Sequence, residues 1–192
     1  SSTSVYGGGG NDSIVVSGST DNGTNIFDAG TGNDTVFFQS AGVDTISGST
    51  ILGGAGADSI LFHSNSAGAL QSALIAGGAG NDYLDGGEEA RTNKYGRDVD
   101  SNGELVQDRL YYIDATSGIN ANFETGVVTD DGFGGADTVL NFERVYGSYH
   151  DDIVQLSHDI YRGYMPMYGN DTITGPSTQE IVNNTYLGYW NL

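Results

Sequence analysis

The sequence contains no cysteine and only two prolines. Without cysteine the fold has no disulfide bonds, which permits an oxidising compartment without proving one. No run of about 18 apolar residues occurs, so the sequence predicts no transmembrane helix. The first residues, SSTSVYGG, include neither a methionine nor the apolar core of a signal peptide, and we expect them to be a boundary within a longer chain.

Positive charge is also scarce. The 25 acidic residues face only 6 basic ones, and every Lys and Arg lies after residue 90. The first 90 residues therefore carry acidic side chains and no cation of their own. A segment of this charge repels nucleic acid, because both are anionic, and it needs cations from its surroundings to neutralise it.

Glycine, in contrast, is abundant, with 31 residues among 192, and many of these glycines belong to a repeat. Four similar segments begin at residues 7, 29, 53 and 77 and read GGGGNDSIV, AGTGNDTVF, GGAGADSIL and GGAGNDYLD. Each carries one aspartate at its sixth position: Asp12, Asp34, Asp58 and Asp82, at intervals of 22, 24 and 24 residues. A fixed period of this length is typical of a solenoid, in which each repeat forms one coil.

Apolar residues keep the same register as the aspartates. One lies two residues after each aspartate, at Ile14, Val36, Ile60 and Leu84, and another lies seven residues before, at Val5, Phe27, Ile51 and Ile75. Short β-branched runs such as SIVV favour strands, and the glycine clusters favour turns. The sequence therefore predicts an all-β chain, a parallel β-roll or β-solenoid with coils of about 24 residues that stack strand upon strand.

The repeated aspartates predict calcium sites between neighbouring coils. Stacked strands lie about 4.8 Å apart, and two bare carboxylates about 4 Å apart repel each other by about 4 kcal/mol at an effective dielectric constant near 20. A Ca²⁺ ion between them reverses this interaction, because its bonds to oxygen of about 2.3 to 2.6 Å fit the gap. Glycine lets backbone carbonyls turn inward as further ligands. The candidate ligands are Gly8, Gly10, Asp12, Gly30, Gly32, Asp34, Gly54, Gly56, Asp58, Gly78, Gly80 and Asp82.

The four segments resemble GGxGxDxUx, the nonapeptide of the repeats-in-toxin (RTX) family. Looser copies, QSAGVDTIS, GFGGADTVL, YGSYHDDIV and PMYGNDTIT, add the candidate ligands Asp44, Asp137, Asp151 and Asp171. The resemblance implies a module that folds around Ca²⁺ outside the cell, is disordered without it, and is exported by a type I system.

The chain departs from the RTX pattern in its period. RTX rolls usually repeat every ~18 residues with calcium turns on both edges, whereas here the motif recurs at about 24 residues. The opposite turns, such as SGSTDNGTN, are longer and lack the motif. We therefore expect one ordered column of ions and a mostly empty opposite edge, with Asp44 as the exception.

The sequence repeat stops after GGEEAR. It resumes at QDRLYYI, where Asp108 and Leu110 repeat the D-x-U spacing. Within the intervening segment, DVDSNGELVQD is similar to an EF-hand calcium loop. Its candidate ligands are Asp98, Asp100, Asn102 and Glu104, with Asp108 as a substitute for the final ligand, because Arg109 stands at that position. The alternative is a solvated acidic loop. We divide the chain into a regular calcium-binding roll (1–87), an inserted acidic loop (88–108) and an irregular continuation with a C-terminal cap (109–192).

The C-terminal half is irregular and rich in aromatic residues: most of the 12 Tyr and the only Trp lie from Tyr111 onward. One interpretation is that these side chains fill a wider core and cap the open end of the solenoid. The other is that they form a platform for a sugar or protein partner, made by Tyr146, Tyr149, Tyr161, Tyr164, Tyr168 and Trp190.

No catalytic motif is present: neither HExxH nor GxSxG occurs, and the 3 histidines lack metal-ligand spacing. We expect a non-catalytic, calcium-dependent structural or adhesive module of a large secreted or cell-surface protein, such as a surface-layer protein or an adhesin. The alternative is the C-terminal export and folding module of a type I secreted enzyme or toxin. Calcium ions are the expected partners, and a cell-surface glycan, a protein or self-assembly remain open as further ones.

Overall fold

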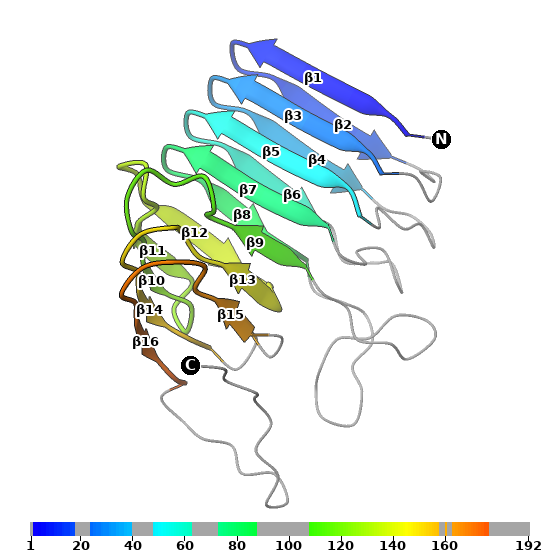
Figure 1. Ribbon diagram of the computed structural model, residues 1–192. Coiled ribbons are helices and arrows are strands. Elements are labelled where there is room, and N and C mark those ends of the chain that lie inside the picture. The colour runs from blue at the N-terminus through cyan, green and yellow to red at the C-terminus, as the bar shows by residue number, and fades with distance from the viewer. Residues whose placement is uncertain are drawn as a thin grey trace, which may run out of the picture.

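The computed structural model describes residues 2–17, 24–39, 48–62, 73–87, 108–157, 160 and 163–176. In these ranges every regular element is a strand, so the expected all-β class is confirmed. The strands form two sheets, and the chain alternates between them through its first eight strands (Figure 1). No helix in the described ranges could cross a lipid bilayer.

The first sheet has seven strands, and all of its pairings are parallel. In sheet order its strands are β1 (Ser4–Gly9), β3 (Ile26–Thr31), β5 (Thr50–Ala55), β7 (Leu74–Ala79), β9 (Arg109–Tyr111), β13 (Arg144–Tyr146) and β15 (Gly163–Met165).

The second sheet has nine strands and is mixed. In sheet order its strands are β16 (Thr172–Thr174), β14 (Ile153–Gln155), β10 (Asn120–Asn122), β11 (Val127–Asp130), β12 (Asp137–Leu140), β8 (Tyr83–Asp85), β6 (Ser59–Phe62), β4 (Thr35–Gln39) and β2 (Ser13–Ser17). The pairs β10–β11 and β11–β12 are antiparallel, whereas the others are parallel. This insertion of β10 and β11 interrupts the repeat in the irregular half.

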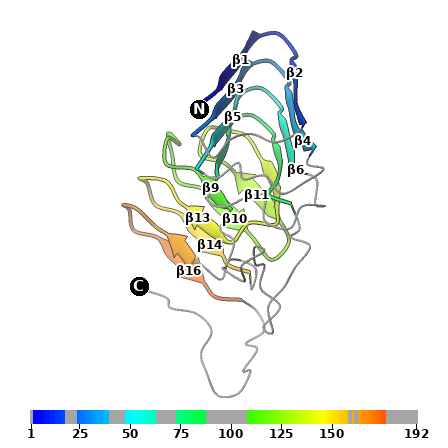
Figure 2. The same ribbon diagram turned by 90° about the vertical axis from the view of Figure 1, so that its right-hand side faces the viewer.

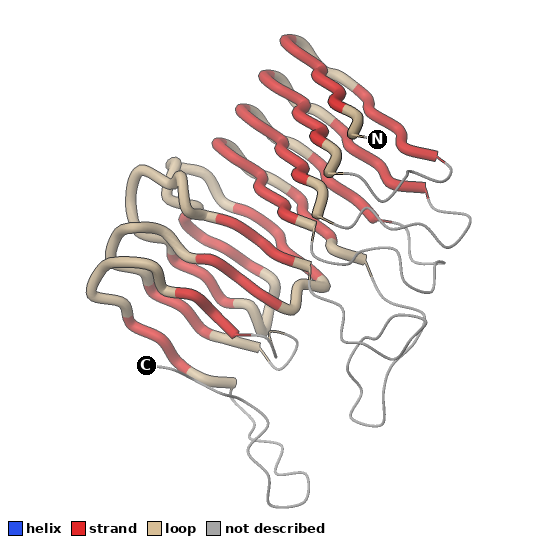
Figure 3. The backbone as a smooth tube through the Cα atoms, turned by 45° about the vertical axis from the view of Figure 1, so that its right-hand side comes forward, coloured by secondary structure: helices blue, strands red, loops and turns tan. Residues whose placement is uncertain are grey.

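The two predicted apolar rows keep their register. Val5 pairs with Phe27, Phe27 with Ile51 and Ile51 with Ile75 in the seven-stranded sheet. The row from Ile14 to Leu84 is in register in the nine-stranded sheet. Parallel in-register pairing places residues of equal repeat position above one another, so both rows face the space between the sheets. Figures 2 and 3 show the first four repeats as successive steps with a sheet on either side.

The core between the sheets contains an aromatic stack. Phe38 packs edge-on against Phe27, with ring centroids 5.1 Å apart, and lies parallel to Phe62 at 4.4 Å. In the two apolar rows, the side chains of Ile51, Ile60, Ile75 and Leu84 are fully buried. Burying one such side chain stabilises the fold by about 1.5–3 kcal/mol, so the two rows supply much of the cohesion of the repeat region.

One predicted register is wrong. The spacing from Asp108 to Leu110 suggested the motif of the aspartate turn, but Leu110 pairs with Ile75 in the seven-stranded sheet. Asp108 therefore precedes β9, at the edge opposite the glycine-rich turns. A two-residue D-x-U spacing is too short a signal to decide which of two inward rows a strand joins.

Candidate metal centre

The glycine-rich turns that join β1 to β2, β3 to β4, β5 to β6 and β7 to β8 lie along one edge of the molecule (Figure 1). Gly54 and Gly56 have φ angles of 109° and 132°, a region that favours glycine. A Cβ atom at either position would collide with the carbonyl oxygen of Gly30 or Gly32 in the preceding repeat. Glycine is therefore required both by the backbone angle and by the close stacking of neighbouring turns.

The other predicted glycines share this geometry. All eight have positive φ, and in the second to fourth repeats each faces a carbonyl of the turn before it. They are Gly8, Gly10, Gly30, Gly32, Gly54, Gly56, Gly78 and Gly80. Because all four turns share this backbone geometry, they stack on one another and bring the aspartates of successive repeats into line.

The aspartates of successive turns form a hydrogen-bonded row. The N–H of Asp12 donates to Oδ1 of Asp34 at 2.7 Å, and the N–H of Asp34 donates to Oδ1 of Asp58 at 2.8 Å. The row continues from Asp58 to Asp82 at 2.9 Å and from Asp82 to Asp137 at 3.0 Å. From Asp34 onward, each carboxylate thus uses one oxygen to accept a hydrogen bond from the backbone of the preceding repeat.

The second oxygen of the four repeat aspartates has no hydrogen-bond partner. The Oδ2 atoms of Asp12, Asp34, Asp58 and Asp82 are all buried and unpaired. A buried polar group without a partner costs about 1–3 kcal/mol, and more when it is charged. Four such atoms in one row form a set of negative charges that the described protein groups leave uncompensated.

A main-chain oxygen borders the same position as Oδ2. A Cβ atom at Gly53 would lie 2.6 Å from Oδ2 of Asp58 and 2.5 Å from the carbonyl oxygen of Gly77, which belongs to the next turn. The equivalent position at Gly7 borders Oδ2 of Asp12 and the carbonyl of Ala29. In the first and third repeats, the first glycine of the motif therefore lets two oxygens approach its Cα more closely than a side chain would allow, whereas the second repeat has Ala29 at this position. Sequence reasoning missed these glycines as site residues, because it assigned the ligand role to the second and fourth positions.

Burial and the charge of neighbouring carboxylates raise the pKa of three aspartates of the row. Burial raises the pKa of Asp82 to about 6, a hydrogen bond from the N–H of Asp58 opposes the rise, and the charges of Asp58 and Asp131 add to it. Burial likewise raises the pKa of Asp137 to about 7, and the charge of Asp82 contributes. The pKa of Asp58 is also raised, chiefly by burial. A site with these properties favours a cation or protons near its carboxylates.

Asparagines form a second row beside the aspartates. The Oδ1 atom of Asn11 accepts the N–H of Asn33 at 2.9 Å, and Oδ1 of Asn33 accepts the N–H of Ala57 at 2.9 Å. Likewise, Oδ1 of Asn81 accepts the N–H of Ala136 at 2.9 Å. The asparagine side chains accept hydrogen bonds from backbone N–H groups of the following turn. The aspartate side chains accept them from N–H groups of the preceding turn. The two rows together fix the spacing of the turns.

Asp131 is a buried carboxylate that sequence reasoning missed. Its Oδ1 accepts the N–H groups of Phe133 at 2.7 Å and Gly135 at 2.8 Å, and its Oδ2 is buried without a partner. A Cβ atom at Gly135 would lie 2.7 Å from that Oδ2 and would also collide with the carbonyl of Gly80. Asp131 therefore lies at the end of the aspartate row. It precedes Asp137 by six residues, outside the repeat pattern, so the sequence carried no periodic signal for it.

The predicted position of Asp151 is off by one residue. Asp151 is exposed, and its Oδ1 accepts the N–H of Asn170 at 2.8 Å, which is the role of the asparagine row. Asp152 is buried and has the same role as the row aspartates beyond β11: its Oδ1 accepts the N–H of Ile119, which precedes β10, at 2.9 Å. The N–H of Asp152 donates to Oδ1 of Asp171 at 2.9 Å, so Asp171 lies where it was expected. Two adjacent aspartates left the register ambiguous in the sequence.

Asp108, another predicted ligand, does not join the row. Asp108 is buried before β9, and its N–H donates to Oε2 of Glu143 at 2.7 Å. The remaining candidates lie outside the described residues: Asp44, Asp98, Asp100, Asn102 and Glu104.

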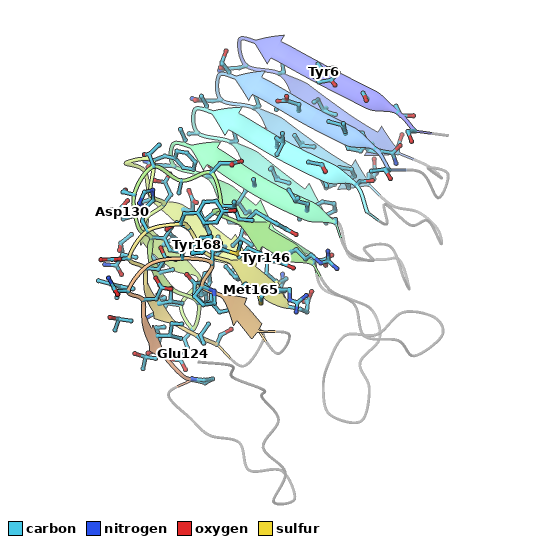
Figure 4. The ribbon with its side chains drawn as sticks, viewed as in Figure 1. Tyr6, Glu124, Asp130, Tyr146, Met165 and Tyr168 are labelled. Carbon is cyan, nitrogen blue, oxygen red and sulfur yellow. The ribbon has the colours of Figure 1, made fainter. Side chains whose placement is uncertain are left out.

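The predicted aromatic platform does not form a single surface. Tyr146 stacks on Tyr111 with centroids 4.3 Å apart, on the seven-stranded sheet (Figure 4). Tyr149 and Tyr168 form a separate exposed pair at 5.4 Å, and Tyr164 is buried. Of the other two members, Tyr161 and Trp190 lie outside the described residues. The described tyrosines thus divide between surface and core, so neither interpretation accounts for all of them.

No group of three or more His, Asp or Glu side chains suited to a metal ion occurs within the described ranges. Any cation site in the row would therefore combine single carboxylates with main-chain oxygens. Comparison of the sequence with models of known protein families and with curated proteins gives no match.

Proposed function

We propose that this chain is a non-catalytic, calcium-binding β-roll module of a larger secreted or cell-surface protein, with a structural or adhesive role. The observation that carries the proposal is the row of buried, unpaired Oδ2 atoms from Asp12 to Asp82. Each belongs to a separate turn, and the turns repeat at the strand spacing.

In the first and third repeats, the oxygens beside Oδ2 suit a hard divalent cation. Ca²⁺ prefers oxygen ligands from carboxylates and backbone carbonyls. In the third repeat, Asp58 and the carbonyl of Gly77 would hold the ion, and the absence of a side chain at Gly53 lets the two oxygens lie near each other. In the first repeat, Asp12 and the carbonyl of Ala29 have the same relation. A bound cation would supply the positive charge that the first 90 residues lack.

The energetics favour folding in a calcium-rich environment. Extracellular calcium modules typically bind with dissociation constants of about 10⁻⁴ to 10⁻³ M. A site filled at ten times its dissociation constant contributes about 1.4 kcal/mol of stability, and several sites approach the stability of a whole domain. At cytoplasmic calcium levels this contribution nearly vanishes. The resemblance to RTX repeats supports the same proposal: a module exported in an unfolded form that folds outside the cell.

Isothermal titration calorimetry of the full chain with CaCl₂ tests the proposal, with MgCl₂ as a comparison. We expect calcium binding at more than one site and a gain of β-structure by circular dichroism as chelator is replaced by calcium. Asp34→Asn should lower the calcium stoichiometry, because it removes one charge from the row. Asp28→Asn removes the same charge from the same repeat, outside the row, and serves as the matched control. Equal effects of the two variants, or no binding by the wild type, would overturn the proposal.

A further inference from the structure

The last aspartates of the row differ from the first four in the partner of Oδ2. The hydroxyl of Tyr112 donates to Oδ2 of Asp137 at 2.9 Å, and the hydroxyl of Tyr164 donates to Oδ2 of Asp152 at 2.5 Å. The N–H of Ser148 also donates to Oδ2 of Asp152, at 3.0 Å. At Asp137 and Asp152, protein groups satisfy the oxygen that the first four repeats leave unpaired, whereas Oδ2 of Asp131 stays without a partner.

The hydroxyl of Tyr164 lies where the first half places a main-chain oxygen. Gly147 precedes Asp152 by five residues, as Gly53 precedes Asp58. A Cβ atom at Gly53 would meet Oδ2 of Asp58 and the carbonyl of Gly77. At Gly147 it would meet Oδ2 of Asp152 and the hydroxyl of Tyr164 instead. A hydrogen-bond donor thus lies beside this carboxylate in place of a second acceptor.

This exchange changes what the position can bind. Two facing oxygens that are both acceptors repel each other and are brought together by a cation. A carboxylate and a hydroxyl donor satisfy each other directly, and a hydrogen bond to a charged acceptor contributes about 1.5–3 kcal/mol. A cation that entered such a position would have to displace the hydrogen bond first.

Both tyrosines are placed to remain donors. Tyr112 is 3% exposed and Tyr164 is 8% exposed, and each reaches its carboxylate from the seven-stranded side of the core. Burial, followed by the charge of Asp137, raises the pKa of Tyr112 well above its ordinary value. Burial and the hydrogen bond to Asp152 raise the pKa of Tyr164 in the same direction. Each phenol therefore keeps its proton at neutral pH.

We propose that the hydroxyls of Tyr112 and Tyr164 take the place of a cation at Asp137 and Asp152, so that these turns hold together without calcium. The inference rests on the proposed function, because it assigns calcium to the turns of Asp12 to Asp82 and excludes it at the tyrosine-capped aspartates. It separates the calcium-dependent turns of the first four repeats from the two tyrosine-capped turns at Asp137 and Asp152.

Calcium stoichiometry tests the exclusion. Asp58→Asn should lower the number of calcium ions bound by the full chain, whereas Asp152→Asn, which makes the same change at a capped position, should leave that number unchanged. The proposal would be overturned if Asp152→Asn lowered the stoichiometry as Asp58→Asn does. Failure of the proposed function would look different, since the wild-type chain itself would then bind no calcium.

Hydrogen exchange in chelator tests the capping independently of any bound metal. In the wild-type chain, amides of β13 and β14 should be protected at least tenfold more than those of β5 and β6. Tyr164→Phe, which removes only the hydroxyl, should reduce the protection of β14 about tenfold, whereas Tyr146→Phe, on the outer face, should not. Equal exchange of the two regions in the wild type, or equal effects of the two variants, would overturn the proposal. Tyr112→Phe provides a second capped position if Tyr164→Phe fails to fold.

Discussion

The N–H of Asp34 donates a 2.8 Å hydrogen bond to Oδ1 of Asp58, 24 residues later, and leaves Oδ2 of Asp58 buried without a partner. The same aspartate therefore fixes the spacing of two turns and presents one uncompensated negative oxygen. Stacking the repeats requires this arrangement, and the cost of the unpaired oxygens is what a bound cation would remove. The predictions below separate these two roles.

Replacing Asp58 by asparagine should have opposite effects with and without calcium. The amide oxygen of Asp58→Asn can still accept the N–H of Asp34, but the buried charge is gone. In chelator we expect the variant to be more stable than the wild type by about 1 kcal/mol, because an unpaired charge is removed. In millimolar calcium it should be less stable by a similar amount. Thermal unfolding in both conditions measures the difference, and a shift of the same sign in both would contradict the assignment.

In chelator, lowering the pH from 8 to 5 should stabilise the fold. The pKa values of Asp82 and Asp137 are about 6 and about 7 in the folded chain, against an ordinary value of 3.8. Because the folded state binds these protons more tightly, the stabilisation is fully present below pH 3.8 and is lost as the pH rises through 6 and 7. The effect is on the order of a few kcal/mol, at about 1.4 kcal/mol for each pKa unit.

Urea unfolding at pH 5, 6, 7 and 8 checks this direction. Calcium should reverse it, since protons and Ca²⁺ compete for the same carboxylates and the cation binds the deprotonated form. The apparent calcium affinity should therefore fall as the pH is lowered below about 7. If the calcium-free chain instead loses stability steadily as the pH is lowered from 8 to 5, the raised pKa values of these aspartates do not dominate the pH dependence of its stability.

Adding a methyl group at Gly53 should weaken calcium binding without removing a charge, because it would push apart the two oxygens beside it. The Cβ atom of Gly53→Ala would lie within 2.6 Å of Oδ2 of Asp58, so the turn must shift to admit it. We expect a loss of about 1–3 kcal/mol in stability in calcium and a lower affinity. Gly9→Ala is the control, because its Cβ would meet only Oγ1 of Thr31, at 3.4 Å. Calorimetry on both variants tests this effect.

Removing the carboxylate of Asp131 should ease the ionisation of its neighbours. The charge of Asp131 raises the pKa of both Asp82 and Asp137, so Asp131→Asn should lower both values. The pH dependence of stability in chelator should then move toward lower pH. The exposed Asp130→Asn gives the adjacent control, and NMR titration of the carboxyl carbons measures the shift directly. An unchanged titration would mean that Asp131 is screened from the row.

The aromatic stack should contribute more to the free energy of unfolding than an exposed side chain does. Phe38→Ala removes a ring that contacts both Phe27 and Phe62, and we expect a loss of about 3–5 kcal/mol in the free energy of unfolding. Val15→Ala, at a position 56% exposed in the neighbouring strand, should change stability by less than about 0.5 kcal/mol. Chemical denaturation in calcium compares the two.

Some features of this protein follow from its sequence alone. The period of the motif, the row of aspartates from Asp12 to Asp82 and the two apolar rows could all be predicted. Parallel in-register strands stack residues of equal repeat position, so a linear period becomes a spatial row without knowledge of the rest of the fold. The row at Ile51 and Ile75 is buried for this reason.

Other features depend on contacts that have no period in the sequence. Tyr164 reaches Asp152 from the opposite sheet, Asp131 joins the row from an antiparallel hairpin, and Leu110 pairs with Ile75 across a long insertion. The choice of Asp152 over Asp151 depends on which of two adjacent side chains faces inward, because successive residues of a strand point to opposite faces. Repetition therefore determines where the carboxylates line up, whereas the tertiary packing of unrelated segments decides which of them acquire a protein donor and which are left with an unpaired oxygen.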